Sequence, residues 1–464
     1  MNFLVYDTET TGTATEFDQI LQFAAIVTDE ELNEIETIDI RCQIQPHVVA
    51  NPTALLVTNV HPAQITDQSL PSHYEFVLEI KSFIEQWSPA VITGYNSLAF
   101  DEPLVRQAFY QNLLPTYLTN TNGNTRADVL RMAHACHVHS PGVLDIPVSD
   151  KGNPSFKLDQ LAPLNGFAHE NAHDALDDVR ATLHIMKIIK TQAPNVWEAM
   201  MYNIAKPHIE ALLGTMAPLC LTESHFGRIY RYAVCMAGVN SINPTDFGVV
   251  DLQHDPSDLL DLSVDELVDV RNAREKRIRS VKSNNQPILL SASEQSPNPV
   301  IQEIGYEELE QRAGMVHSRP DFCEKVGQAL AQITEGYEKK DYLEGKIFDG
   351  FPSRDDQQLM RQFHSVNWND RYDLILRMED VRLREAGCRL IYQHAPETLP
   401  VKVTEKLDDW KNSRLTGPAP EKDGWCTVEQ ARVDLQSARS DPRFQDRHEF
   451  LDEIQTYIEQ YAKQ

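Results

Sequence analysis

The chain has 464 residues, of which 41% are hydrophobic, and a formal net charge of −27 at pH 7. Its length exceeds that of one ordinary domain, so we expect two or three domains with separate cores. The sequence contains no run of roughly 18 apolar residues, and no basic segment followed by an apolar one stands at its N-terminus. These patterns exclude an integral membrane protein and predict a cytoplasmic protein that contacts no membrane.

Cysteine content and net charge bear on the class of protein to which the chain can belong. The seven cysteines lie far apart and never at C-x-x-C spacing, which argues against a disulfide framework and a zinc ribbon. The acidic balance argues against nucleic-acid binding, because such proteins neutralise phosphates with Lys and Arg. A site for two divalent cations must itself be acidic, however, and local basic patches can guide a strand over a negative surface. The charge therefore leaves nucleic-acid chemistry open.

The first 195 residues have the pattern of an α/β domain. Short apolar runs bounded by turn residues predict β-strands, at residues 3–6, 21–27, 35–44 and 90–93. Apolar residues at helical spacing predict two helices that face a core. One follows Asp101 with Leu104, Val105, Ala108 and Phe109, and the other follows His173 with Leu176, Val179, Leu183 and Met186.

The pattern changes after residue 195. Residues 196–347 contain short segments with many turn residues, which predict a small β-rich module. An apolar stripe near its end predicts a helix, with Phe322, Val326, Leu330 and Ile333. Residues 348–464 have helical periodicity. We therefore expect three domains, over residues 1–195, 196–347 and 348–464.

The end of the first predicted strand carries a candidate site. Asp7 and Glu9 are two residues apart, so both side chains point to the same face of the strand. Such an oxygen cluster suits a hard cation such as Mg²⁺. The D-x-E pattern is short and common, however, and on its own it more often marks a solvated strand end.

Further carboxylates follow later in the chain. Asp101 ends the segment GYNSLAFD directly before a predicted helix, where it also fits the role of a helix N-cap. His173 precedes Asp178 by five residues, which is about 140° around a helix. The side chains of His173 and Asp178 therefore converge only if His173 lies in the loop entering the helix or in its first turn.

In chain order, D-x-E on a first strand, N-x-x-x-F-D in mid-domain and H-x₄-D on a late helix resemble the DEDDh exonucleases. The resemblance implies two bound Mg²⁺ ions, with Mn²⁺ as a possible substitute, held by the carboxylates of Asp7, Glu9, Asp101 and Asp178. It also implies that His173 removes a proton from the attacking water, a role that suits an unperturbed pKa near 6.5. The expected products are 5′-mononucleotides.

A narrower resemblance, to the bacterial exonuclease I family, extends over nearly the whole chain. It rests on the segments PSFKLD at 154–159, NG at 165–166 and NAHDA at 171–175, with GYN at 94–96 and, more faintly, Gly350, Phe351 and Ser353. That family joins an RNase H-like nuclease domain, a small SH3-like domain and a C-terminal helical domain into a groove for single-stranded DNA. The resemblance implies a 3′-to-5′ exonuclease of single-stranded DNA that serves DNA repair and recombination.

The same resemblance implies contacts with substrate and partners. Glu9 is expected to meet the terminal 3′-hydroxyl, and Arg106 and Lys157 to contact the strand. Lys157 stands where the family would carry Arg, so a bidentate phosphate contact becomes a point-charge contact. Family members are monomers that bind the acidic C-terminal tail of single-stranded-DNA-binding protein. The densest basic run fits a guide for DNA, a dock for that tail or a solvated face, and comprises Arg271, Arg274, Lys276, Arg277, Arg279 and Lys282.

Several alternatives stay open at this stage. The motif set also fits a DEDDh exoribonuclease or a proofreading exonuclease, although proofreading subunits are not expected to carry two further domains. A non-catalytic scaffold that binds single strands would not need the carboxylates. His169 and His173 form a literal H-E-x-x-H zinc-protease motif, but Asn165 and Gly166 favour a loop over the helix that this motif needs. A second metal cluster is disfavoured because its members would not share one helix face, namely His134, Cys136, His137 and His139.

Overall fold

The computed structural model describes residues 1–149, 151–168, 174–225, 227–336, 339–420 and 424–461. The chain forms two compact units, one of Met1–Asn124, Glu170–Arg180 and Lys339–Gln464, the other of Thr125–His169 and Ala181–Glu338. Helix α7 (Ala175–Gln192) begins in the first unit and continues in the second. Among the described helices, none combines the length and the hydrophobicity needed to cross a bilayer.

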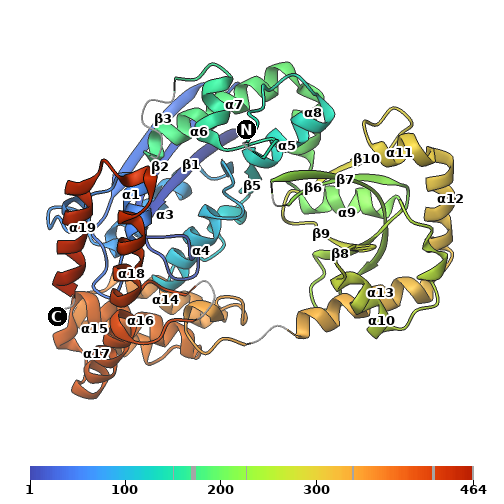
Figure 1. The fold of residues 1–464 in the computed structure, drawn as a ribbon. Coiled ribbons are helices and arrows are strands. Elements are labelled where there is room, and N and C mark those ends of the chain that lie inside the picture. The colour runs from blue at the N-terminus through green and yellow to red at the C-terminus, as the bar shows by residue number, and fades with distance from the viewer. Residues whose placement is uncertain (150, 169–173, 226, 337–338, 421–423, 462–464) are drawn as a thin grey trace. The chain divides into compact units, whose positions relative to one another are not determined.

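The first unit is built on a mixed β-sheet. Strands β3 (Glu34–Arg41), β2 (Ile20–Thr28), β1 (Asn2–Thr10) and β4 (Ala90–Gly94) follow one another across it. Figure 1 shows the first three of these strands side by side. Strand β1 pairs with β2 in antiparallel fashion, and with β4 in parallel fashion from Asn2–Ala90 to Val5–Thr93. Both β2 and β4 are buried over their whole length. A strand that is covered on both faces has a nearly continuous apolar sequence, which explains the runs seen in this region.

Two helices cover this sheet with apolar faces. Helix α3 (His73–Trp87) begins with a capping box in which the side chains and backbone N–H groups of Ser72 and Glu75 bond reciprocally. Helix α4 (Asp101–Gln111) buries the predicted stripe, including Leu104 and Phe109, in the same core as Phe76 of α3. Burying a side chain of this size stabilises the fold by roughly 1.5–3 kcal/mol in transfer free energy. The predicted strands and helices of this region are therefore observed. The burial of its apolar stripe holds α4 against the core of the sheet.

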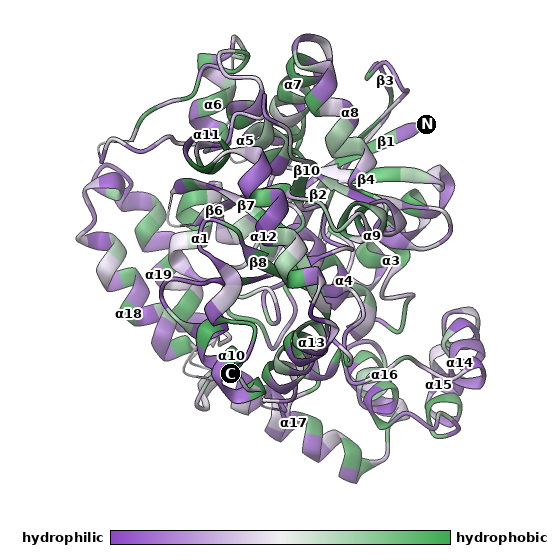
Figure 2. Ribbon diagram, turned by 90° about the vertical axis from the view of Figure 1, so that its right-hand side faces the viewer, coloured by the Kyte–Doolittle hydropathy of each residue, from purple (hydrophilic) through white to green (hydrophobic). Residues whose placement is uncertain are grey.

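The C-terminal helices complete the first unit. Helices α18 (Val428–Arg439) and α19 (His448–Tyr461) share a core with α1 (Pro52–Thr58) and α2 (Pro62–Ile65). In Figure 2, hydrophilic and hydrophobic residues alternate along α18 and α19, as expected of helices with one face against a core. The helices that precede α18 in this part of the sequence are α14 (Arg354–Ser365), α15 (Trp368–Ile375), α16 (Val381–His394) and α17 (Val401–Thr416). The predicted helical C-terminal region is thus observed.

The second unit contains an antiparallel sheet with strand order β10-β6-β7-β8-β9. Helix α13 (Pro320–Glu335) lies against it and buries the predicted stripe from Phe322 to Leu330. A Cβ atom at Gly238 would approach the carbonyl oxygen of Cys323 to 2.5 Å, so a residue without a side chain is needed where β7 meets α13. The strands are β6 (Leu219–His225), β7 (Arg228–Val239), β8 (Asp246–Asp251), β9 (Ile278–Lys282) and β10 (Ile288–Ser291).

The second unit also contains elements that are not strands of this sheet. They are β5 (Thr125–Asp128), α5 (Val129–His139), α6 (Leu158–Leu164), α8 (Pro194–Tyr202), α9 (Lys206–Gly214), α10 (Val264–Asn272), α11 (Pro299–Ile304) and α12 (Tyr306–His317). The predicted β-rich module is observed, while its SH3-like type and the three domain boundaries stay predictions. One prediction was wrong in extent. The strand expected over 35–44 ends at Arg41, because the N–H groups of Gln43 and Ile44 bond instead to the carbonyl oxygens of Pro71 and of Ile65, the last residue of α2.

Candidate active site

Strand β1 and helix α7 bring three acidic side chains together. Carboxylate oxygens of Asp7, Glu9 and Asp178 lie within 4.8 Å of one another. Asp7 and Glu9 point to one side of β1 because side chains alternate along a strand. Asp178 lies in the first turn of α7, where its N–H bonds to the carbonyl oxygen of Asp174. Three of the four predicted ligands are therefore neighbours, and their role as metal ligands stays a prediction.

Asp101 enters the same site from the start of α4. It lines one pocket together with the other three carboxylates, and Thr8 Oγ1 donates a hydrogen bond of 2.6 Å to Asp101 Oδ1. The GYN segment explains this approach. A Cβ atom at Gly94 would collide with the carbonyl oxygen of Tyr6, so only glycine lets the end of β4 lie this close to β1. Asn96 then takes a left-handed conformation with a φ of 61°, which turns the chain towards α4.

His173, the predicted general base, and His169 of the H-E-x-x-H pattern lie outside the described residues. Helix α7 begins at Ala175. The described residue before it, Asp174, accepts a hydrogen bond of 3.2 Å from the N–H of Leu176 and lies 2.9 Å from the guanidinium Nη2 of Arg41. Arg41 ends strand β3. The ion pair therefore ties the beginning of α7 to the sheet immediately beside the position of His173 in the sequence.

The carboxylates of this cluster repel one another. Burial raises the pKa of Asp7 well above its ordinary value, and the charges of Asp101, Asp178 and Glu9 raise it further. Burial likewise raises the pKa of Glu9, and the charge of Arg41 opposes this only in part. Groups with raised pKa values take up protons unless a cation is supplied. Because all four donors are carboxylates, the set suits a hard divalent ion.

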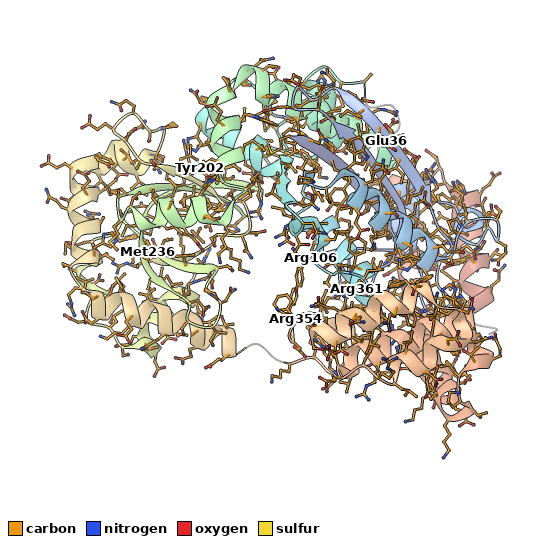
Figure 3. All side chains as sticks on the ribbon, turned by 180° about the vertical axis from the view of Figure 1, so that it is seen from behind. Glu36, Arg106, Tyr202, Met236, Arg354 and Arg361 are labelled. Carbon is orange, nitrogen blue, oxygen red and sulfur yellow. The ribbon has the colours of Figure 1, made fainter. Side chains whose placement is uncertain are left out.

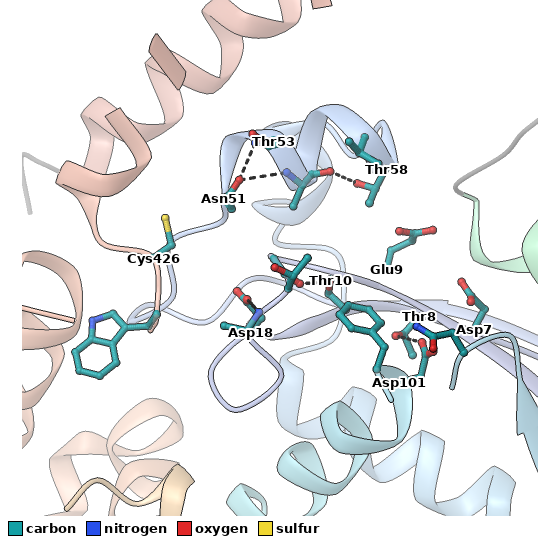
Figure 4. A pocket seen from close by; sticks show the side chains of 18 of the residues that line it. Asp7, Thr8, Glu9, Thr10, Asp18, Asn51, Thr53, Thr58, Asp101 and Cys426 are labelled. Atoms are coloured by element: carbon teal, nitrogen blue, oxygen red, sulfur yellow. Dashed lines mark hydrogen bonds between the residues drawn. The ribbon is translucent and has the colours of Figure 1, made fainter. Parts of the chain in front are cut away.

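The pocket around the carboxylates has a volume of about 680 Å³, a size typical of sites for small organic ligands. Figure 4 shows the carboxylates of Asp7, Glu9 and Asp101 among the side chains that line it, together with Asn51, Thr58 and Cys426. Residues 424–426 and two side chains of α18, Gln430 and Asp434, also line it. The C-terminal helices therefore contribute to the wall of the catalytic pocket.

The structure places the predicted substrate contacts in different settings. Arg106 pairs with Glu102 at 2.7 Å, and its guanidinium lies 5.1 Å from the ring centre of Tyr117. Lys157 is exposed and precedes α6 in the second unit. Part of the predicted basic run is neutralised within that unit, because Arg277 pairs with Asp258 at 2.6 Å and Arg279 lies 3.0 Å from Glu223. The contacts of Arg106 and Lys157 with a strand stay predictions.

The sequence analysis did not identify three parts of this site. Thr8 stands between the two carboxylates of the D-x-E motif, and its hydroxyl could have been expected to serve a neighbouring acid. Asp174 directly follows His173, but no pattern indicates that Arg41 is its partner. No sequence pattern indicates that α18 lines this pocket. Its contact with α1 joins Asn51 to Asp434, which are 383 positions apart in the chain and 2.8 Å apart in the structure.

Comparison with known proteins gives matches over both ends of the chain. Residues 4–186 match the family model described as Exonuclease, and residues 341–461 match that described as Exonuclease I C-terminal domain. Exodeoxyribonuclease I of Haemophilus influenzae is 29% identical over 439 residues, covering 90% of this chain and 92% of the relative. The corresponding protein of Buchnera aphidicola subsp. Acyrthosiphon pisum is 30% identical over 317 residues, covering 66% of this chain and 75% of the relative.

A solved structure extends the likeness to the whole fold. E. coli exonuclease I in complex with a dT13 oligonucleotide has a TM-score of 0.84 against this chain, with 25% sequence identity and 99% of each chain covered. The agreement includes the α/β nuclease region and the C-terminal helices. The fold expected from the sequence is therefore confirmed at this level.

Proposed function

Because the chain belongs to the exodeoxyribonuclease I family, we propose that it removes nucleotides one at a time from the 3′ ends of single-stranded DNA. The observation that carries this proposal is the gathering of Asp7, Glu9, Asp101 and Asp178 in one pocket. These carboxylates repel one another, and the neighbouring Lys and Arg side chains do not neutralise them. Such a cluster is better suited to binding metal ions than to stabilising the fold. Family membership supports the proposed reaction, and the pocket supports the proposed position of the active site in this chain.

The enzymes of this superfamily use divalent metal ions. The donor set fits such ions, because carboxylate oxygens are the ligands that Mg²⁺ prefers and their mutual repulsion is relieved by added positive charge. We propose two Mg²⁺ ions, with Mn²⁺ as a substitute, held by the four carboxylates. Bound ions supply Lewis-acid stabilisation of the charge that develops on the reacting phosphate.

The chain's own residues orient the substrate and move the proton. As the family resemblance implies, Glu9 is proposed to meet the terminal 3′-hydroxyl, and His173 to take the proton from the attacking water. Asp174, held by Arg41 at 2.9 Å, steadies the start of α7 beside His173. Arg41 is therefore a positioning residue in this proposal, and the product is a 5′-mononucleotide.

An aromatic pocket in the first unit supports a single-stranded substrate. It has a volume of about 440 Å³ and is lined by Tyr117, Phe351 and Arg361, among others. The rings of Tyr117 and Phe351 are 5.5 Å apart, and Figure 3 marks Arg106 on α4 and Arg361 on α14. Stacking on aromatic rings suits unpaired bases of any sequence, because every base has a π-face.

The backbone turn that precedes the exposed ring of Phe351 is held by hydrogen bonds. Phe351 is 79% exposed, yet Arg382 donates hydrogen bonds to the carbonyl oxygens of Lys346 at 2.8 Å and of Gly350 at 3.0 Å. Gly350 has a φ of 136°, which residues with a side chain rarely adopt. An exposed aromatic side chain on a fixed turn loses little entropy on binding, which favours its role as a stacking platform.

The cellular setting follows from the family. We propose that the protein acts in the cytoplasm in DNA repair and recombination, as a monomer that binds the acidic C-terminal tail of single-stranded-DNA-binding protein. The basic residues of the second unit that are not engaged by Asp258 or Glu223 support such an acidic partner.

The test is a time course with one sequence offered as 5′-labelled single-stranded DNA, duplex DNA and RNA. We expect a ladder that shortens from the 3′ end on single-stranded DNA, that requires Mg²⁺ and that EDTA abolishes. Faster cleavage of RNA would assign the chain to another branch of the superfamily. Absence of cleavage on all three substrates would refute the proposed function.

A further inference from the structure

The wall of the catalytic pocket opposite the carboxylates contains a chain of hydrogen bonds. Asn51 Oδ1 accepts hydrogen bonds from the N–H groups of Thr53 at 2.8 Å and Ala54 at 3.3 Å, and so caps helix α1. Its Nδ2 donates to Asp434 Oδ2 at 2.8 Å. Gln430 Nε2 donates to the other oxygen, Asp434 Oδ1, at 2.9 Å. The carboxylate of Asp434 is therefore bonded on both oxygens.

These bonds fix the orientation of the Gln430 amide. A carboxylate only accepts hydrogen bonds, so it selects the NH₂ end of each amide that faces it. The NH₂ group of Gln430 must then face Asp434, and its carbonyl oxygen Oε1 must face away. Within the described parts of the chain, Oε1 of Gln430 accepts no hydrogen bond, and Gln430 lines the pocket that contains Asp7, Glu9, Asp101 and Asp178.

The position of Gln430 is also fixed along the helix. Its N–H donates to Thr427 Oγ1 at 3.1 Å, which is the N-cap bond of α18. Asp434 follows four residues later on the same helix face. The helix itself shares a core with α1. Gln430 is exposed, but bonds to its backbone N–H and to its amide nitrogen hold the side chain in place. The acceptor oxygen therefore loses little freedom when it binds a ligand.

An amide oxygen in this pocket can bind only a ligand group that donates a hydrogen bond. Phosphate and the ring oxygen of the sugar only accept hydrogen bonds, and phosphate is also repelled by Asp434. The 3′-hydroxyl can donate, but the proposed function assigns it to Glu9. All four bases, in contrast, have an N–H donor on the Watson–Crick edge: the amino groups of adenine, cytosine and guanine, and N3–H of thymine. One acceptor therefore serves any sequence, provided that the base is unpaired.

We propose that Gln430 accepts a hydrogen bond from the Watson–Crick edge of the terminal base, with Asp434 as its positioning residue. The inference rests on the proposed function, because it assumes that the 3′-terminal nucleotide of a single strand occupies this pocket. It adds a reason for the preference for single strands. A terminal base in a duplex has this edge occupied by its partner, and must unpair before it reaches Gln430.

The experiment compares two 5′-labelled single strands that differ only in the terminal base, adenine or unsubstituted purine, which lacks the exocyclic amino group. Wild type is expected to release adenylate with a kcat/KM about three- to ten-fold higher than purine nucleotide, as one hydrogen bond allows. Gln430→Met keeps the side-chain length without the acceptor and should treat both ends alike. Glu429→Met, at the neighbouring exposed position, should keep the wild-type preference.

Asp434→Asn provides a second variant, because loss of the charge lets the Gln430 amide turn and should reduce the preference. Equal rates on both strands for wild type, or an undiminished preference in Gln430→Met, would overturn the inference. In those cases the hydrogen bonds serve only to join α18 to α1, and the variants would change the unfolding temperature alone. A wild type that cleaves neither strand would refute the proposed function itself, and the inference with it.

Discussion

Two buried acidic sites in the first unit differ in what surrounds them. Glu344 is 1% exposed, and its Oε1 lies 2.9 Å from Arg389 Nη1 and 3.4 Å from Arg414 Nη1. Asp7 and Glu9 lie instead among other carboxylates. Burial alone raises the pKa of a carboxyl group at both places. At Glu344 the two arginines outweigh burial and bring its pKa below the ordinary value, whereas at Asp7 the neighbouring acids add to the effect of burial.

The difference separates a structural site from a reactive one. The charge of a buried acid beside buried arginines is neutralised within the fold, and the acid stabilises the fold only while all partners are present. A buried group of acids is incomplete without an external cation. A carboxylate therefore holds helices together at the fully buried Glu344, whereas at the half-buried Asp7 it belongs to the proposed metal site.

The largest expected effect is on activity. Asp7→Asn or Asp178→Ala should lower kcat on single-stranded DNA by a factor on the order of 10³ or more, since each removes a member of a catalytic unit. Both variants should unfold in EDTA at a temperature no lower than wild type, because they relieve repulsion in the metal-free protein. Turnover and thermal unfolding measure the two effects, and a loss of folding would contradict the distinction drawn here.

The converse is expected at Glu344. Glu344→Gln removes the anion that Arg414 pairs with and one of the two that Arg389 pairs with. It should lower the free energy of unfolding by about 3–5 kcal/mol. Activity per folded molecule should stay near wild type. Glu385→Gln is the matched control. Glu385 also pairs with Arg389, at 2.6 Å, but it is 45% exposed, so its loss should change the free energy of unfolding by less than about 1 kcal/mol.

The two sites should respond to pH with opposite signs in EDTA. At Glu344 the folded-state pKa is lowered, so its contribution to stability is present above the unfolded pKa and is lost as the pH falls through the folded value. At Asp7 the folded-state pKa is raised, so the folded chain binds a proton first and gains stability as the pH falls from that value towards about 3.8.

Chemical unfolding between pH 8 and pH 4 measures this contrast. Asp7→Asn should be more stable than wild type at pH 8, and this advantage should shrink as the pH falls. Glu344→Gln should be less stable than wild type at pH 8, and its deficit should shrink only below about pH 4, the ordinary carboxyl range. A shared sign for the two differences at pH 8 would show that the sites are not distinct.

The smallest expected effect is that of Arg41. Arg41→Ala removes the partner of Asp174 and should lower kcat about ten-fold, the scale typical of residues that orient a metal site indirectly. KM should change little, because Arg41 is not proposed to touch the strand. Arg41→Lys should recover part of the loss, since a cation remains. Equal losses in Arg41→Ala and Arg41→Lys would mean that the ion pair does not position the start of α7.

Local sequence patterns identified the parts of the site that depend on local rules. Alternation along a strand was enough to place Asp7 beside Glu9, and strand and helix periodicity placed Asp101 and Asp178 at the ends of their elements. The close packing of β4 on β1 is visible in the sequence only as Gly94, whose meaning depends on the carbonyl oxygen of Tyr6.

Contacts between distant segments were not predictable. The bond between Asn51 and Asp434 spans 383 positions, and the pairing of Glu344 with Arg414 joins a 3₁₀ turn to the end of α17. Neither has a spacing rule, because tertiary packing sets which side chains meet. For the same reason the sequence predicted a C-terminal helical region and not its part in the catalytic pocket.

The central claim is that the four carboxylates form a divalent metal site that drives cleavage from 3′ ends. Single-turnover hydrolysis of 5′-labelled single-stranded DNA, followed over a range of Mg²⁺ concentrations for wild type and Asp178→Asn, tests it most directly. The account predicts a rate that rises with Mg²⁺ and saturates for wild type, and a rate near background for Asp178→Asn at every concentration. Cleavage by wild type in EDTA, or by Asp178→Asn at the wild-type rate, would contradict it.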